Sequence, residues 1–206
     1  MKHFPFISAL VFFIYLGCKQ SPGPLPILGE SEIVNGDTIF HQIPDFSFLD
    51  QYGQPYNQDS VFSKVYVSDF FFTKCPTICP KMAQQLLRVH QKFGHNPEFR
   101  ILSHSIDPKY DTTEALKKYA DKLGVGDSRT WHFLSVPKNE ISAIAGKYLA
   151  AVQQDSTLEE GFTHTGHFLL IDHKRRIRSF CDGTKPNEVD RLMKEISLLL
   201  DEKKPQ

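Results

Sequence analysis

The chain has 206 residues, of which 40% are hydrophobic and 23% are charged, a composition that supports one folded domain with a sizeable core. The 24 basic side chains equal the 24 acidic ones in number, so the protein has no net field with which to hold nucleic acid, and we expect no nucleic-acid partner. The cysteines are Cys18, Cys75, Cys79 and Cys181, and this set is too sparse for a disulfide-stapled miniprotein. Any disulfide would therefore be functional rather than a framework.

Residues 1–18 have the pattern of an export signal. Lys2 supplies the positive start, and the apolar run that follows, from Phe4 to Leu16, is too short to span a bilayer comfortably. The run ends directly before Gly17-Cys18, which predicts a bacterial lipoprotein signal with Cys18 as the lipidated first residue. An uncleaved anchor is the alternative. Both interpretations place the body of the protein in the cell envelope, outside the cytoplasm and tethered to a membrane.

Residues 19–42 are rich in Pro, Gly and Ser and show neither a helical nor a strand period, which predicts a flexible linker. Residues 43–206 then form the predicted domain. Apolar alternation and β-branched or aromatic content predict strands within 43–50, 65–72, 99–107, 131–136, 167–172 and 177–182. Helical spacing of apolar residues predicts helices over 81–93, 111–124, 138–149 and 186–202.

Strands and helices alternate along this domain until a final hairpin and helix. This order predicts an α/β, thioredoxin-like fold, with a central mixed sheet flanked by helices. The loop after the strand at 65–72, which contains two of the cysteines, would then follow the carboxyl end of a central strand. Open α/β sheets bind their ligands at that edge.

Cys75 and Cys79 have three residues between them and lie directly before the predicted helix at 81–93. If the segment is helical, their Cα atoms approach to roughly 6 Å, which a disulfide tolerates. A helix N-terminus stabilises negative charge, so we expect a lowered pKa for at least one thiol. A thiolate serves both as a nucleophile and as a metal ligand. The three-residue gap suits two sulfurs on one soft ion better than the shorter gap of thioredoxin-type redox motifs does, but the spacing alone is a weak signal.

A metal site on two sulfurs usually needs a third ligand. His164 and His167 precede the predicted strand at 167–172 and are the candidates. Residues three apart in an extended segment point to opposite faces, so at most one of the two would reach the cysteine loop. An inert pair of buried cysteines is disfavoured, because Pro76 and Pro80 indicate a turn at the surface.

The stretches DFFFTKCPTICPKM, LSHSIDPKYDT, WHFLSV and FTHTGHFLLID, in this order, resemble the Sco/SenC proteins, which assemble the copper centres of cytochrome c oxidase. The resemblance covers roughly residues 43–200. It implies one copper ion, as Cu(I), Cu(II) or both, held by Cys75, Cys79 and His164. It also implies that the partner is the copper-bearing oxidase subunit, with other copper chaperones or thiol reductants as further partners. Two thiolates and an imidazole are ligands suited to copper.

The same resemblance and the local patterns assign the remaining candidates. Asp107 matches an aspartate of the family and is expected either beside the site or in a turn. Asp111 precedes Thr-Thr-Glu, so we interpret it as a helix N-cap. His167 is expected to be structural and Cys181 to be a small buried hydrophobe, and His104 receives no role.

Two functions remain open from the sequence. The first is a copper chaperone; the alternative is a thiol–disulfide oxidoreductase, in which Cys75 and Cys79 cycle between dithiol and disulfide to reduce the cysteines of the oxidase. General oxidoreductases of this fold normally have a cis-proline facing the cysteines, where this chain has Thr163-His164-Thr165. That difference favours the metal. A thiol peroxidase is disfavoured, because the cysteine loop contains lysines but no arginine.

Overall fold

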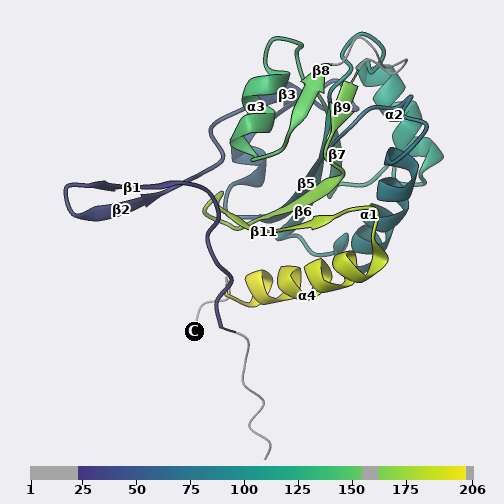
Figure 1. Cartoon of the computed structure of the whole chain (residues 1–206). Coiled ribbons are helices and arrows are strands. Elements are labelled where there is room, and N and C mark those ends of the chain that lie inside the picture. Colours follow the sequence, from purple (N-terminus) through teal and green to yellow (C-terminus); the bar gives the residue numbers. More distant parts are fainter. Residues whose placement is uncertain (1–22, 155–161, 203–206) are drawn as a thin grey trace, which may run out of the picture.

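The computed structural model describes residues 23–154 and 162–202 of the chain. A seven-stranded sheet forms its centre, in the order β11-β10-β5-β6-β7-β3-β4 (Figure 1). Its strands are β3 (Ser47–Leu49), β4 (Pro55–Asn57), β5 (Val65–Phe71), β6 (Phe99–Ser105), β7 (Trp131–Ser135), β10 (His167–Ile171) and β11 (Ile177–Asp182). Two small sheets pair β1 (Ser31–Val34) with β2 (Asp37–Phe40) and β8 (Val152–Gln154) with β9 (Phe162–His164). The helices are η1 (Gln58–Val61), a 3-10 helix, and α1 (Cys79–Phe93), α2 (Thr113–Lys122), α3 (Ile141–Lys147) and α4 (Pro186–Glu202).

The strand pairing confirms the predicted thioredoxin-like α/β order. β5 pairs with β6 and β6 with β7 in parallel, because α1 and α2 carry the chain back between them. β10 runs antiparallel to β5 and forms a hairpin with β11, as predicted for the last two strands. β5 is thus a central strand, and the cysteine loop follows its carboxyl end.

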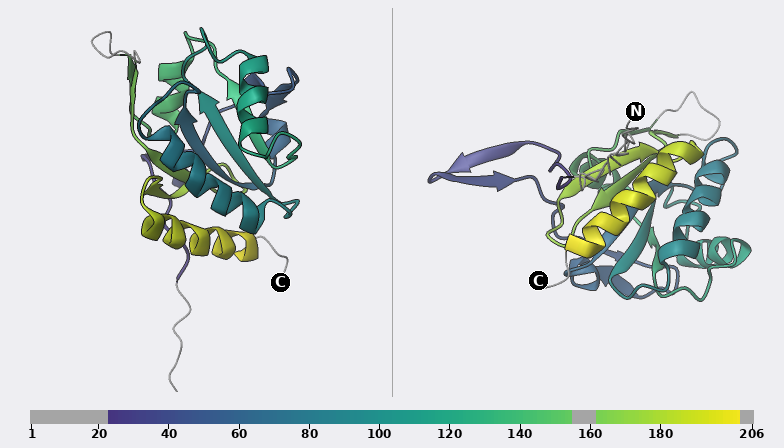
Figure 2. Two further views of the ribbon diagram at one scale, coloured as in Figure 1. Left: turned by 90° about the vertical axis from the view of Figure 1, so that its right-hand side faces the viewer. Right: turned by 90° about the horizontal axis from the view of Figure 1, so that it is seen from below.

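Helices cover both faces of the sheet. α1 and α4 lie side by side on one face (Figure 2), and their predicted inward residues are buried. These are Met82, Leu86, Val89 and Phe93 of α1 and Val189, Leu192, Met193 and Ile196 of α4. Burying one such side chain contributes roughly 1.5–3 kcal/mol. The side chains of β5 alternate, so that Phe71 contacts Tyr119 of α2, whereas Phe70 contacts Tyr148 at the end of α3.

The segment predicted to be a flexible linker contains a β-hairpin. β1 and β2 pair with Val34 opposite Asp37, and the turn residues Asn35 and Gly36 have φ values of 53° and 87°. Asn-Gly favours this type of turn, because both central residues need positive φ. The expectation of no strand over residues 19–42 is therefore wrong for this part. The hairpin projects from the domain body (Figure 1), and its residues are exposed.

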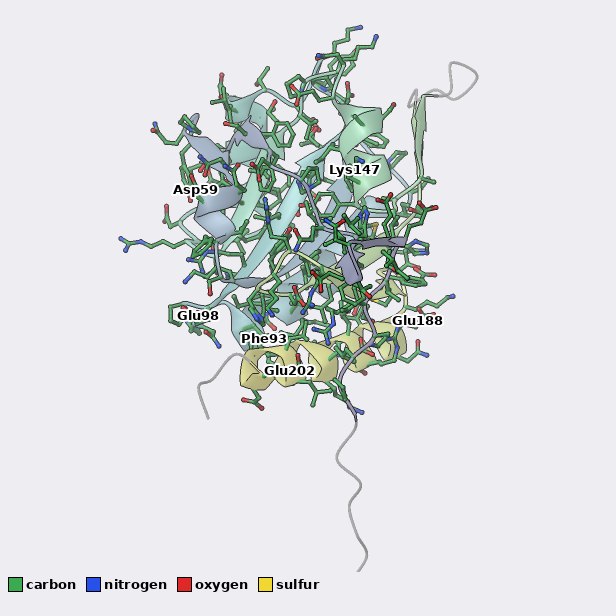
Figure 3. All side chains as sticks on the ribbon, turned by 90° about the vertical axis from the view of Figure 1, so that its left-hand side faces the viewer. Asp59, Phe93, Glu98, Lys147, Glu188 and Glu202 are labelled. Atoms are coloured by element: carbon green, nitrogen blue, oxygen red, sulfur yellow. The ribbon has the colours of Figure 1, made fainter. Side chains whose placement is uncertain are left out.

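Residues 25–28, here called the N-terminal strap, are also not a free linker. Arg178 donates a hydrogen bond from Nη2 to the Leu25 carbonyl at 2.6 Å, and the Leu28 N–H donates to the carbonyl of the first β11 residue at 2.8 Å. Both leucines contact the hydrophobic core. Arg178 is held in turn by the buried Asp172 and by Glu202. Glu202, at the end of α4, is labelled in Figure 3. The strap therefore covers the outer edge of β11.

The strap lies at the end of the sheet opposite the cysteine loop. Ile171, the last residue of β10, pairs with Tyr66 near the start of β5, so β11 begins at that end. The predicted signal over residues 1–18, including Cys18, falls outside the described residues. Within the described ranges, no helix combines the length and the apolar character that crossing a membrane would require.

Candidate metal centre

The two cysteines lie where β5 gives way to α1. Phe71 and Phe72 are buried and hold the end of the strand in the core. The chain then turns, and the Cys75 N–H donates to the Phe72 carbonyl at 3.2 Å. α1 begins at Cys79, with Pro80 in its first turn, where the missing N–H has no helical partner to lose. The three residues between the cysteines follow this turn as an irregular bend rather than the helical segment assumed in the spacing argument.

The two sulfurs are shielded from solvent and adjacent. Cys75 is 8% exposed and Cys79 is 3% exposed, and both are reduced thiols. A hydrogen bond with Cys75 and burial raise the pKa of the Cys79 thiol, so this thiol does not show the lowering expected at a helix N-terminus. The Cys75 sulfur also lies 3.7 Å from the Thr77 hydroxyl. A thiol–thiol hydrogen bond places the sulfurs close enough to form a disulfide or to share one metal ion.

The predicted third ligand, His164, is the last residue of β9. Its backbone pairs with Val152 of β8, whereas its side chain lies outside the described part of the structure. Two residues later the chain touches the cysteine loop: a Cβ atom at Gly166 would lie 3.3 Å from Ile78 Cδ1 and 3.5 Å from Met82 Sδ. Ile78 directly precedes the second cysteine. The segment that follows His164 therefore lies against the cysteine loop. That His164 is a metal ligand stays a prediction.

A complete metal site is not present on the described side chains alone. Among them, no group of three His, Cys, Asp or Glu residues lies together as ligands would. The buried hydroxyl of Thr165, next to His164, has no hydrogen-bond partner within the described ranges. The predicted set of two thiols and one imidazole therefore depends on His164 for its third donor.

Asp111 is bound to the cysteine loop rather than to a helix. Its fully buried carboxylate accepts hydrogen bonds from the Thr73 N–H at 3.1 Å, the Thr73 hydroxyl at 2.5 Å and the Ser105 hydroxyl at 2.6 Å. Thr112 caps α2 instead, because its hydroxyl accepts the Ala115 N–H at 3.3 Å. The prediction that Asp111 caps this helix is wrong.

Asp107 forms a turn next to the cysteine loop. Its carbonyl accepts the N–H of Tyr110 at 3.1 Å and the N–H of Asp111 at 2.9 Å, which confirms one of its two expected roles. Burial, together with the neighbouring Asp111 charge, raises the pKa of the Asp107 carboxyl. The exposed face of this turn is cationic and aromatic, since Lys74 Nζ lies 3.5 Å from the centroid of the Tyr110 ring.

The other candidates have structural positions. His167 begins β10, and its ring centroid lies 5.6 Å from that of Phe180. His104 is fully buried in β6 and contacts Tyr148 at the end of α3. Cys181 is the buried hydrophobe that was predicted, and burial raises the pKa of its thiol to about 12.

A polar cluster behind Cys79 was not anticipated. Asp69, in β5, is buried and accepts a hydrogen bond from the Ser103 hydroxyl at 2.6 Å, and Ser103 accepts one from the Trp131 indole at 2.9 Å. These residues line a cavity of about 10 Å³ together with Cys79, enough for one water molecule. The signal was a carboxylate within the otherwise apolar run before the cysteine loop.

Comparison with known proteins places this arrangement in a family. A family model described as SCO1/SenC matches residues 37–200, which include the cysteine loop, the turn containing Asp107 and the strand that ends at His164. The chain belongs to the SCO1/SenC family. A relative named SCO1 protein homolog, from Bacillus subtilis, is 27% identical over 162 residues, covering 78% of this chain and 83% of the relative. A SCO2-like protein of Rickettsia felis is 33% identical over 200 residues, covering 91% of this chain and 90% of the relative.

Solved structures of SCO1/SenC proteins share the fold. A SCO1/SenC family lipoprotein from Bacillus anthracis has a TM-score of 0.70 at 24% identity, over 77% of this chain and 95% of its own. BsSco, described as having a disulfide switch and as a member of the Sco family of cytochrome c oxidase assembly proteins, has a TM-score of 0.67 at 26% identity, over 77% and 93%. Arabidopsis thaliana ScoI with copper bound has a TM-score of 0.64 at 20% identity, over 77% and 98%.

Proposed function

We propose that this SCO1/SenC protein is a membrane-tethered copper chaperone. It binds one copper ion through Cys75, Cys79 and His164 and delivers it to the dinuclear copper site of cytochrome c oxidase during assembly. The observation that carries this proposal is the hydrogen-bonded thiol pair at the carboxyl end of β5, which the strand from His164 approaches through Gly166. The copper bound to Arabidopsis thaliana ScoI, and the oxidase-assembly role stated for BsSco, support the choice of cargo and recipient.

The predicted donor atoms suit a copper ion that is bound and later released to another protein. Two thiolates and one imidazole match the softness of copper, and three protein ligands leave a side open for a ligand from the recipient. Because the pKa of the Cys79 thiol is raised, that thiol is protonated before copper arrives. Copper binding therefore releases protons, and the affinity should increase with pH.

The decisive experiment compares His164→Ala with the matched control His167→Ala in the reduced domain. Loss of a direct ligand should weaken Cu(II) affinity by more than the roughly 10–100-fold that loss of an outer-shell partner causes. His167→Ala should leave the affinity close to that of the wild type, and the disulfide should form in both variants. The measurement is competition with a chelator of known affinity. Equal affinities for the two variants would remove His164 from the site.

A second function uses the same sulfurs as a thiol–disulfide oxidoreductase. The adjacent, reduced thiols favour it, as does the disulfide switch described for BsSco. In this reaction the Cys75 and Cys79 thiols lose two electrons and two protons to form a disulfide, and a disulfide between the oxidase cysteines is reduced to two thiols. A thiol reductant would then reduce the Cys75–Cys79 disulfide again, and another copper chaperone would supply the copper ion. In a strain that lacks the protein, rescue of oxidase activity by excess copper supports delivery, and rescue by a small reductant supports the redox function.

The tether is part of the proposal. Cys18 becomes the lipidated N-terminus, as the description of the Bacillus anthracis protein as a lipoprotein supports, and the domain lies outside the cytoplasm. The mature wild-type protein should begin at Cys18 and carry the added mass of a lipid, and the Cys18→Ser variant should lack that added mass. A mature protein whose mass shows a free N-terminus at another residue would contradict lipidation at Cys18.

A further inference from the structure

The side chain and the backbone carbonyl of Asp111 together join three chain segments at the edge of the sheet that bears the cysteines. Thr73, two residues before Cys75, donates to it from both its N–H and its hydroxyl, at 3.1 and 2.5 Å. Ser105, the last residue of β6, donates its hydroxyl at 2.6 Å. The Ser135 hydroxyl, at the end of β7, donates to the Asp111 carbonyl at 3.4 Å. One buried residue therefore connects the start of the cysteine loop to the ends of the two neighbouring strands.

The chemistry of these contacts needs a carboxylate. All three groups that reach the Asp111 side chain are donors, and an ionised carboxylate is an acceptor on both oxygens. An amide has one acceptor oxygen and places an NH₂ group where the second oxygen was, so Asn would lose or reverse at least one of these three hydrogen bonds. Burying a carboxylate is costly unless it is hydrogen-bonded, and a buried polar cluster that is fully satisfied favours one local conformation over others.

We propose that Asp111 is a positioning residue for the Cys75–Cys79 pair, and that it acts through Thr73. By holding Thr73, the second residue after β5, it limits the conformations in which the Cys75 sulfur can lie beside Cys79. The Thr73 bonds link its carboxylate to the loop, so the effect does not require contact between Asp111 and either sulfur. The inference rests on the proposed use of the two cysteines as one pair.

Two variants separate this role from general stability. Asp111→Asn replaces one of the two acceptor oxygens with an NH₂ group, and Thr73→Val removes only the hydroxyl that donates to the carboxylate, with nearly the same side-chain shape. Asp50→Asn is the matched control. Asp50 is also a buried aspartate that accepts hydrogen bonds from two N–H groups, those of Tyr52 and Gln54, at 2.9 and 3.0 Å. It lies in the turn between β3 and β4, beside His132 near the start of β7.

The readout is the equilibrium constant for forming the Cys75–Cys79 disulfide in copper-free protein, measured in glutathione redox buffers. A loosened loop lowers the effective concentration of one thiol at the other, so both Asp111→Asn and Thr73→Val should lower this constant, by about tenfold or about 30 mV for the aspartate variant. Asp50→Asn should leave it within twofold of the wild type while lowering the unfolding free energy. The double variant Thr73→Val/Asp111→Asn should fall no further than Asp111→Asn, because both changes break the same link.

The proposal is overturned if Asp111→Asn and Asp50→Asn shift the constant equally, or if neither shifts it. If Asp111→Asn does not fold, Thr73→Val alone decides: a constant within twofold of the wild type overturns the proposal, and a larger decrease supports it. The measurement contains no copper. Failure of the wild-type domain to bind copper would therefore count against the chaperone function and leave this test unaffected.

Discussion

Acidification should destabilise the domain through His104. The ring is fully buried in β6 between Phe70 and Tyr148, and its Nδ1 lies 3.1 Å from the Ser68 hydroxyl. Burial lowers the pKa of His104 to about 4 from its ordinary value of 6.5, since water cannot reach the ring to stabilise its charged form. Nε2 has no hydrogen-bond partner among the described residues. A proton on this ring would therefore place an unpaired charge in the core.

The sign and size of the effect follow from the two pKa values. Between pH 6.5 and pH 4 the unfolded chain binds a proton at His104 that the folded domain does not bind, so stability rises with pH across this window. The stability is complete above pH 6.5 and is lost as the pH falls toward 4. The full loss is about 3 kcal/mol, from a shift of roughly 2.5 pKa units at 1.36 kcal/mol each, and roughly 2 kcal/mol of it is already lost at about pH 5.

The assay is urea unfolding of the copper-free, reduced domain at several pH values from about 5 to 8. His104→Phe is the informative variant, because a phenylalanine keeps the aromatic contacts and does not titrate. Its unfolding free energy should depend less on pH, by roughly 2 kcal/mol over this range. Burial also lowers the pKa values of His90 and His132, so part of the slope should remain. Parallel curves for the wild type and His104→Phe would refute the reasoning.

The remaining predictions concern the site and its support. Gly166→Val should weaken copper affinity roughly tenfold, about 1.4 kcal/mol, because the valine side chain would push the segment after His164 away from the cysteine loop. Gly146 has open space around it, so Gly146→Ala should leave the affinity unchanged. Equal copper affinities of the two variants, measured by chelator competition, would contradict this prediction. The free energy of unfolding, measured in urea, should be about 3 kcal/mol lower for a domain spanning 30–206 than for one spanning 23–206, because the shorter domain lacks the hydrogen bonds of the N-terminal strap. Equal free energies of unfolding would exclude a structural role for the strap. Cys181 should resist alkylation until the domain unfolds, as mass spectrometry of the native, reduced protein would show; modification of the native protein at the rate measured for the urea-unfolded chain would contradict its burial.

The parts of the fold with strong periodicity were predictable from the sequence. The run at 65–72 is mostly apolar on both faces, apart from Ser68 and Asp69, because β5 is a central strand covered by helices on both sides; all seven residues of β5 are buried. α1 and α4 were predictable for a related reason, since their apolar residues recur at helical spacing and all of those named were buried. Patterns of this kind report burial directly. The position of the cysteine loop followed from them, because the loop connects two such elements.

The features that sequence reasoning missed depend on partners distant in the chain. Asp111 and Thr112 are both good helix caps by residue type, and only the approach of Thr73, 38 residues earlier, determines that Asp111 binds the loop. The raised pKa of Cys79 arises from the nearby Cys75 thiol and from burial in the folded domain, which together outweigh the helix N-terminus. The Asn35-Gly36 turn is a different case. Its signal was local, and it was masked by the Pro- and Gly-rich composition of the segment around it.

The two proposed functions use one chemical state of the cysteine pair. Copper requires both thiols reduced and then deprotonated, and the oxidoreductase requires the same dithiol as its electron donor. The adjacency that lets Cys75 and Cys79 hold one ion also lets them close a disulfide, so oxidation competes with copper for the same sulfurs. A protein that delivers copper must therefore keep the disulfide from forming before loading. The burial of both sulfurs serves that end, since it restricts access by oxidants, while His164, if it is the third ligand, adds affinity to the copper form alone.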